Sequence, residues 1–251
     1  AVIVMIETHV ANALLQPEIK HDTIFKILAF INGLVAPSFL FCSGFAFAIA
    51  LGRKWNDFSS LSKPFWRYLV RLLFILVVGY SLHLPFFSLS KLLAITDPTL
   101  WLPFFQTDIL QTITVTLMML ALFIAILRNE RVFIWTVTLV GAIFIFAAPF
   151  VRESDLGNLP VWLQPYLTLK VISQFPLFPW SAFLIVGLIV GYWYIRANVA
   201  ARGPRFMHRL LVGAAAAIAL SVLIEIMPVV IYPNHDFWRA SPEFFFVRAG
   251  V

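Results

Sequence analysis

Residues 1–44 read AVIVMIETHVANALLQPEIKHDTIFKILAFINGLVAPSFLFCSG, and this stretch indicates the fold of the whole chain. It joins the end of one apolar segment to most of the next through a short polar linker. Two histidines, His9 and His21, lie at this junction. Apolar runs separated by a polar linker are typical of consecutive membrane helices, with the polar groups at one mouth of a helix bundle.

The composition of the 251-residue chain supports the same interpretation throughout. Hydrophobic residues make up 61% of the sequence, charged residues make up 12%, and the mean hydropathy is +0.93. A soluble core cannot hold so large an apolar share, so the composition indicates an integral membrane protein. The apolar runs approach the roughly 20 residues that cross a bilayer, and they lack the alternation of barrel strands. We therefore predict an all-α, polytopic transmembrane helix bundle.

We predict six full spanning helices and a partial helix at each terminus, within a single membrane domain that covers residues 1–251. The first partial helix ends near Leu15 and the last begins near Phe244, so we expect the sequence to be a fragment truncated at both ends. The full helices are expected at residues 24–52, 65–84, 107–127, 132–150, 178–195 and 210–231.

Local sequence adds detail to three of these regions. Pro37 is expected to interrupt helix 24–52, because proline removes one backbone hydrogen bond. Gly187 and Gly191 have the spacing of small residues that lets two helices approach closely. Residues 151–175 contain no spanning run, and we expect the stretch PYLTLKVISQFP to lie along the membrane surface.

Positive charges gather in alternate loops. The positive-inside rule assigns these loops to the cytoplasm, so His9 and His21 are expected on the outer side. The same loops account for the net charge of +6, which therefore gives no reason to expect a nucleic-acid partner. The residues concerned are Arg53, Lys54, Lys63 and Arg67, then Arg128 and Arg131, then Arg196, Arg202, Arg205 and Arg209.

The histidines near the outer mouth are the first candidates for chemistry. His9 and Asn12 are three residues apart, so they share a helix face, and Asn12 is a candidate substrate-binding residue. An imidazole can take a proton or act as a nucleophile near neutral pH. His9 can equally be hydrogen-bonded to a neighbouring helix, and His21 can be a solvated linker residue. His83, at a helix end, favours a structural role.

Two carboxylates are further candidates. Asp108 stands at the start of helix 107–127, where it can cap the helix or orient a catalytic imidazole, and both interpretations stay open. Glu225 lies inside a predicted spanning helix. Ionisable groups at this depth cost a few kcal/mol, so they usually have a partner, a water-filled cavity or a function. Glu225 is therefore a candidate substrate-binding residue.

Arg67 and Arg71 form a candidate anion site on the inner side. They share one helix face at i and i+4, where like charges repel each other. A phosphate-bearing ligand entering from the cytoplasm would remove that repulsion. The alternative is that both side chains extend to lipid headgroups.

The ordered apolar segments resemble a known family. MIETHV, PSFLFCSG, WRYLVRLLFILVVGY, TDILQTITVTLMML and FPWSAFLIVGLIVG are similar, in this order, to consecutive helices of the heparan-alpha-glucosaminide N-acetyltransferase-like membrane acyltransferases. The resemblance covers about residues 2–195. In bacterial members the first helix has an Asp and Arg-Gly before an apolar run that ends in Met and His. Met5 and His9 match the end of that run.

This resemblance implies transfer of an acyl group, usually acetyl from cytoplasmic acetyl-CoA, to an amine or hydroxyl of a sugar or glycan on the far side. It implicates an outer histidine as acyl carrier or general base. His9 matches the bacterial pattern, while Lys20 and His21 resemble the Lys-His pair of the lysosomal enzyme. We therefore expect catalysis by His9, with Asp108 and His21 as further candidates, and binding of acyl-CoA by Arg67 and Arg71.

We expect a multi-pass protein of the plasma membrane with acyl-CoA and a glycan acceptor as partners, no metal, and a homo-oligomer as an open possibility. Cys42 is expected to be a small buried apolar residue. One alternative is a transporter or channel that uses Glu225, Asp108, Pro37 and Pro228 as a gated ion site. Another is a catalytically inactive membrane scaffold. The sequence contains no CxxC, HExxH, GxSxG or glycine-rich phosphate loop.

Overall fold

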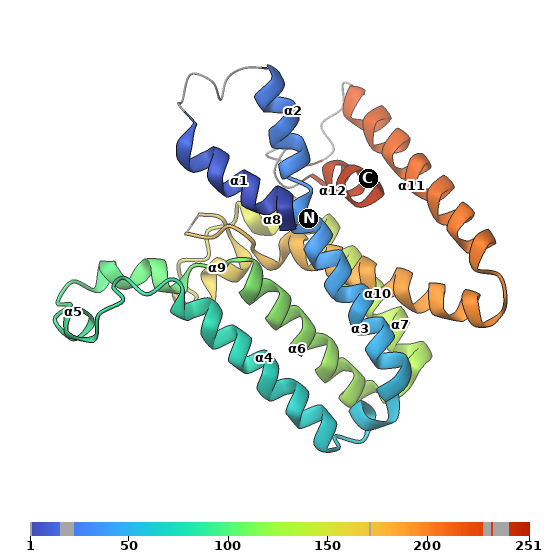
Figure 1. The fold of residues 1–251 in the computed structure, drawn as a ribbon, viewed down its shortest axis with the longest axis horizontal. Helices are drawn as coiled ribbons and strands as arrows, with labels where there is room; N and C mark the ends of the chain where they lie inside the picture. Colours follow the sequence, from blue (N-terminus) through green and yellow to red (C-terminus); the bar gives the residue numbers. More distant parts are fainter. Residues whose placement is uncertain (1, 16–22, 171, 228–231, 233–240) are drawn as a thin grey trace.

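The computed structural model describes residues 2–15, 23–170, 172–227, 232 and 241–251. Within these ranges the chain is a bundle of helices without a strand, which confirms the predicted all-α membrane class (Figure 1). The described helices are α1 (Val2–Leu14), α2 (Thr23–Asn32), α3 (Val35–Ser59), α4 (Lys63–Ser81), α5 (Leu89–Leu93), η2 (Pro98–Phe105), α6 (Ile109–Leu127), α7 (Glu130–Phe146), α8 (Ala148–Arg152), α9 (Gln164–Leu167), α10 (Leu177–Val199), α11 (Gly203–Ile226) and α12 (Pro242–Gly250).

Five helical segments of the described chain are long and apolar enough to cross a membrane. Four of them are α4, α6, α10 and α11, and the fifth runs through α2 and α3 from Ile27 to Ser59. The sixth predicted spanning helix corresponds to α7, which has 17 residues and is followed directly by the short α8. The helix positions therefore follow the sequence prediction. Five of the six predicted spans are long enough in the described chain, and the sixth, α7, is shorter than the others.

The interruption predicted at Pro37 lies earlier in the chain. The helix breaks at Gly33 and Leu34, and Pro37 is buried in the first turn of α3. Backbone N–H groups in a first turn have no acceptor within their own helix, so proline costs little there. Pro37 therefore belongs to the start of a helix and does not kink it.

The closest helix contact joins α3 to α10, which run in the same direction. An ideal Cβ at Gly44 would overlap the carbonyl oxygen of Leu184, and one at Gly187 would overlap that of Phe41. At Gly191 the added atom would lie 2.8 Å from Ala48 Cβ. Only glycine permits these backbones to approach so closely, which confirms the predicted role of Gly187 and Gly191.

Helix α10 is the centre of the bundle and packs against α3, α6, α7 and α11. Helix α4 pairs with α6, and α11 stands at the edge of the bundle beside α12 (Figure 1). A buried hydrogen bond of 2.7 Å joins the hydroxyls of Thr116 and Ser181 across α6 and α10. The largest fully buried side chains include Phe65, Phe133 and Leu184.

The bundle has two chemically different ends. The end that we call the histidine end carries His83, Asp108 and residues 148–170 and 172–176. The opposite end, which we call the arginine end, carries the turns α3–α4, α6–α7 and α10–α11, where most of the Arg residues lie. Contacts link these turns, because the Trp55 ring packs on Phe133 and Arg196 pairs with Glu130 at 3.2 Å. The loops that the charge pattern grouped together are therefore grouped in space.

Candidate functional site

Asp108 caps α6 and also faces a histidine. Its Oδ1 accepts a 2.7 Å hydrogen bond from the Ile109 N–H, and its own N–H donates to Gln111 Oε1 in a capping box. Its other oxygen, Oδ2, lies 3.7 Å from Nε2 of His83. The carboxylate also complements the positive end of the helix dipole. Both interpretations of Asp108 from sequence are therefore compatible, and the imidazole beside it is His83.

His83 follows the last turn of α4, and each of its ring nitrogens faces an oxygen acceptor. Nδ1 lies 3.0 Å from the carbonyl oxygen of Gly79, and Nε2 faces Asp108. The doubly protonated ring can serve both acceptors, whereas each neutral tautomer can donate to only one of them. The side chains of His83 and Asp108 are 16% and 35% exposed, so this pair lies at the edge of the packed bundle.

The segment after α9 is docked onto the start of α6. Gln174 and Phe175 donate their backbone N–H groups to the Thr107 carbonyl at 3.0 and 3.2 Å, and Thr112 Oγ1 donates to the Phe175 carbonyl. Thr168 is buried and donates to the Arg152 carbonyl at 2.8 Å. Backbone groups of this stretch therefore find partners at the histidine end of the bundle, and its place along the membrane surface stays a prediction.

A tyrosine pair connects the same segment to α4. The hydroxyls of Tyr80 and Tyr166 are 2.7 Å apart, and Tyr166 is buried. Burial raises the pKa of the Tyr166 phenol, which stays protonated and available as a donor. Polar contacts at the histidine end thus join α4 to α9 and residues 174 and 175 to the start of α6.

The remaining outer candidates are not brought into this network by any contact described. His9 is exposed on α1, and Asn12 lies on the same helix, where only its backbone is described. Glu225 is half-buried in the last turn of α11. His21, Lys20 and Pro228 lie outside the described residues.

Arg67 and Arg71 lie on the exposed face of α4, opposite the buried Phe65 and Leu72. They are near the arginine end, as predicted, and they point away from the core of the bundle. Other arginines gather at this end between α10 and α11, where a pocket of about 430 Å³ is lined by Arg196, Arg202, Arg205 and Arg209.

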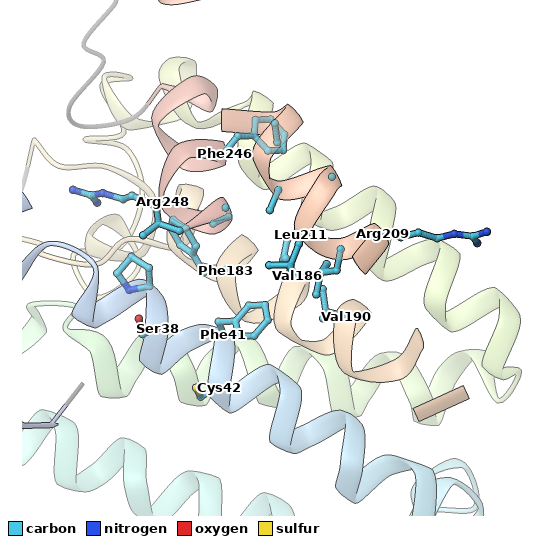
Figure 2. Close-up of a pocket in the computed structure, with 18 residues that line it drawn as sticks. Ser38, Phe41, Cys42, Phe183, Val186, Val190, Arg209, Leu211, Phe246 and Arg248 are labelled. Atoms are coloured by element: carbon cyan, nitrogen blue, oxygen red, sulfur yellow. The ribbon is translucent and has the colours of Figure 1, made fainter. Parts of the chain in front are cut away.

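An apolar pocket of about 550 Å³ lies between α3, α10, α11 and α12 (Figure 2). Phe41, Phe183 and Phe246 contribute ring surface to it. Cys42 also lines it and is exposed, so the expectation of a buried residue is wrong. Figure 2 shows that Arg209 and Arg248 reach the pocket with their aliphatic stems while their guanidinium groups turn away from it. The surface of this pocket is therefore mostly apolar, and no charged group points into it.

Sequence reasoning missed Arg152 and Arg248, which line a separate pocket at the histidine end together with Asn32 and Trp180. Arg248 follows the apolar run PEFFFV, and an arginine embedded in apolar sequence is a signal that could have identified it. In the part of the chain that the structure describes, no three His, Cys, Asp or Glu side chains are grouped as metal ligands would be.

Comparison with known proteins gives one positive result. The family model described as heparan-alpha-glucosaminide N-acetyltransferase, catalytic, matches residues 1–224. Searches of curated proteins and of solved structures found no match. The matched range contains His9, both ends of the bundle and the described spanning helices, of which α11 is covered up to Ile224.

Proposed function

Because this chain belongs to the heparan-alpha-glucosaminide N-acetyltransferase catalytic family, we propose that it transfers an acetyl group from cytoplasmic acyl-CoA to an amine or hydroxyl of a sugar on the outer side. The family match over residues 1–224 carries this proposal. The match and the spanning helices make the chain a multi-pass membrane protein of an acetyltransferase family. We place it in the plasma membrane.

The two ends of the bundle support this reaction. The arginine end offers guanidinium groups, which bind phosphate oxygens well, and the positive-inside rule assigns that end to the cytoplasm. The histidine end offers imidazole and carboxylate groups, which can move protons near neutral pH. A bundle with these two ends can accept an anionic donor on one side and deprotonate an acceptor on the other.

His9 is the proposed catalytic histidine, and His21 is the competing position. As a nucleophile, an imidazole nitrogen attacks the thioester carbonyl and expels the CoA thiolate, and the acceptor amine then takes the acetyl group and releases a proton. As a general base, the imidazole takes that proton directly while the amine attacks the thioester. Asp108 is proposed to hold a neighbouring imidazole, and its contact with His83 adds His83 to the candidates.

Arg67 and Arg71 are the proposed partners of the CoA phosphates, which they would hold from the exposed face of α4. Asn12 and Glu225 are proposed to contact the sugar. Substituting Arg67 by Ala is expected to raise the acyl-CoA concentration needed for half-maximal rate without changing the rate at saturation. Arg53→Ala, which removes another exposed arginine near the same end, serves as the control.

The test is acetyl transfer by purified protein in liposomes, with radiolabelled acetyl-CoA on one side and an amino sugar on the other. His9→Ala is expected to abolish transfer, whereas His208→Ala, which removes an exposed histidine at the arginine end, is expected to retain it. Full activity in a His9→Ala, His21→Ala double variant would refute a mechanism based on either histidine. The same assay on His83→Ala measures the contribution of the Asp108 pair.

A further inference from the structure

Arg209 lines two pockets of different chemistry. One is the apolar pocket of Figure 2, of about 550 Å³, between α3, α10, α11 and α12. The other, of about 430 Å³, lies between the end of α10 and the start of α11, and we call it the arginine pocket. Arg209 contributes its aliphatic stem to the apolar pocket and turns its guanidinium away from it (Figure 2). Because the same residue lines both pockets, they are neighbours.

The same faces of α10 and α11 continue from one pocket into the other. Side chains three or four positions apart share one face of a helix. The lining positions on α11 recur every four residues: Arg205, Arg209, Gly213 and Ala217. Those on α10 recur every three or four residues: Phe183, Val186, Val190, Trp193 and Ala197. The two pockets therefore form one groove, which we call the α10–α11 groove, apolar along most of its length and charged at the arginine end.

The charged part of the groove holds more positive charge than neighbouring carboxylates neutralise. Arg196 pairs with Glu130 at 3.2 Å. Among the described residues, no carboxylate lies within 4.0 Å of the guanidinium groups of Arg202, Arg205 or Arg209. Arg205 and Arg209 are four residues apart on α11, where like charges repel each other. An anion bound between them would replace this repulsion with two attractive contacts.

Helix α11 places the groove against the lipid. It is long and apolar enough to span the membrane, and Gly203 and Ser221 are its only buried residues. From Arg209 to Ala217 the helix rises about 12 Å, a little less than half of the ~30 Å hydrocarbon core. Trp193, half exposed beside the arginines, is of a residue type enriched at membrane–water interfaces. The charged part of the groove therefore suits headgroup depth, and the apolar part suits the depth of acyl chains.

We propose that the α10–α11 groove binds an anionic phospholipid, with the phosphate on Arg205 and Arg209 and one acyl chain in the apolar pocket. Charge complementarity identifies this occupant. A lipid of zero net charge would leave the arginine charges uncompensated, and a small soluble anion would leave the apolar pocket unfilled. Guanidinium groups bind phosphate oxygens through paired N–H donors. The proposal depends on the groove and its charge, and it does not depend on acetyl transfer.

The test is native mass spectrometry of the purified full chain in micelles with equal amounts of phosphatidylglycerol and phosphatidylcholine of identical acyl chains. The measurement counts bound lipids and protein copies together. Phosphatidylcholine is the matched neutral probe, because its choline cancels the phosphate charge. We expect preferential retention of phosphatidylglycerol.

Arg209→Gln is expected to lower that preference about tenfold, because a charge-assisted hydrogen bond is lost. Arg53→Gln is the matched control. Arg53 is another exposed arginine at the arginine end, and it lines neither pocket, so this variant should retain the preference of the unmodified chain.

Gly213→Leu tests the apolar part of the groove. An added Cβ at Gly213 meets no described atom within 4 Å, and leucine is favoured over glycine in a helix, so the variant is expected to fold. Its side chain would occupy the pocket and reduce the retention of phosphatidylglycerol. Gly52→Leu, at a position that is equally open and outside the groove, should not reduce it. This pair decides the question even if Arg209→Gln does not fold.

A phosphatidylglycerol preference that Arg209→Gln and Gly213→Leu both reduce supports the proposal. Equal retention of the two lipids, or a preference that either folded variant leaves unchanged, would overturn it. Palmitoyl-CoA is the competing soluble amphiphile. If it displaces equimolar phosphatidylglycerol and the same variants reduce its own retention, the groove belongs to acyl-CoA and the lipid proposal fails. A dimer that Gly213→Leu converts to a monomer would assign the groove to a second copy, which also overturns the proposal.

Discussion

Replacing Gly44 by alanine tests the contact on which the bundle is built. The added Cβ would overlap the carbonyl oxygen of Leu184 and lie 2.8 Å from both the Leu184 carbonyl carbon and the Leu188 nitrogen. These are backbone atoms, so no rotamer change can relieve the overlap. Helices α3 and α10 must move apart by on the order of 1 Å, and the contacts along the whole interface weaken with them.

Overpacking of this kind costs about 1–3 kcal/mol, and the rigid backbone places Gly44→Ala at the upper end of that range. Gly52→Ala and Gly213→Ala are matched controls, because an added Cβ at either position meets no described atom within 4 Å. Alanine is favoured over glycine inside a helix by roughly 1 kcal/mol, so both controls are expected to be neutral or slightly stabilising.

The assay is reversible unfolding of the purified protein in mixed micelles, followed by helix content as the fraction of denaturing detergent rises. Gly187→Ala probes the same interface at the Phe41 carbonyl, and it is expected to cost a similar amount. The double variant should cost less than the sum, because one substitution already separates the helices. An unfolding free energy for Gly44→Ala equal to that of Gly52→Ala would refute the reasoning.

Three further outcomes follow from the polar contacts. Asp108→Ala is expected to lower the unfolding free energy by about 1 kcal/mol, because the cap of α6 is lost. Asp108→Asn keeps a capping side chain and should retain most of the unfolding free energy, and the same micelle titration compares the two variants. A double-mutant cycle of Thr116→Val and Ser181→Ala should give a coupling of about 0.6–1.7 kcal/mol, and additivity would contradict the buried bond. Glu130→Gln should change stability by less than about 1 kcal/mol, since its pair with Arg196 is about half exposed and screened by salt; a larger, salt-independent loss would contradict this.

The sequence predicted the class of the fold because hydropathy is a local property. Apolar runs of sufficient length define the spanning helices α4, α6, α10 and α11 within one turn or two of their observed ends. The positions of Gly187 and Gly191 predicted a close helix contact, and the ordered segments predicted the family. These conclusions require only length, composition and spacing along the chain.

The candidate site was less predictable, because its residues meet through contacts between distant segments. His83 and Asp108 are joined across α4 and α6, and Asp108 alone did not indicate which imidazole it faces. The sequence of the segment after α9 gave no sign that hydrogen bonds to Thr107 and Thr112 dock it onto the start of α6. Which backbone groups find such partners depends on packing and not on local pattern.

By itself, the sequence determined that this protein is a helical membrane bundle with charge separated between its two ends, because the bilayer imposes helix length and apolar composition on every span. Only the tertiary structure decided that α3 and α10 run side by side in the same direction and that Arg152 and Arg248 border one pocket. The physical reason is that apolar helix faces match one another almost equally well, so the choice of partner depends on the detailed fit of backbones and side chains.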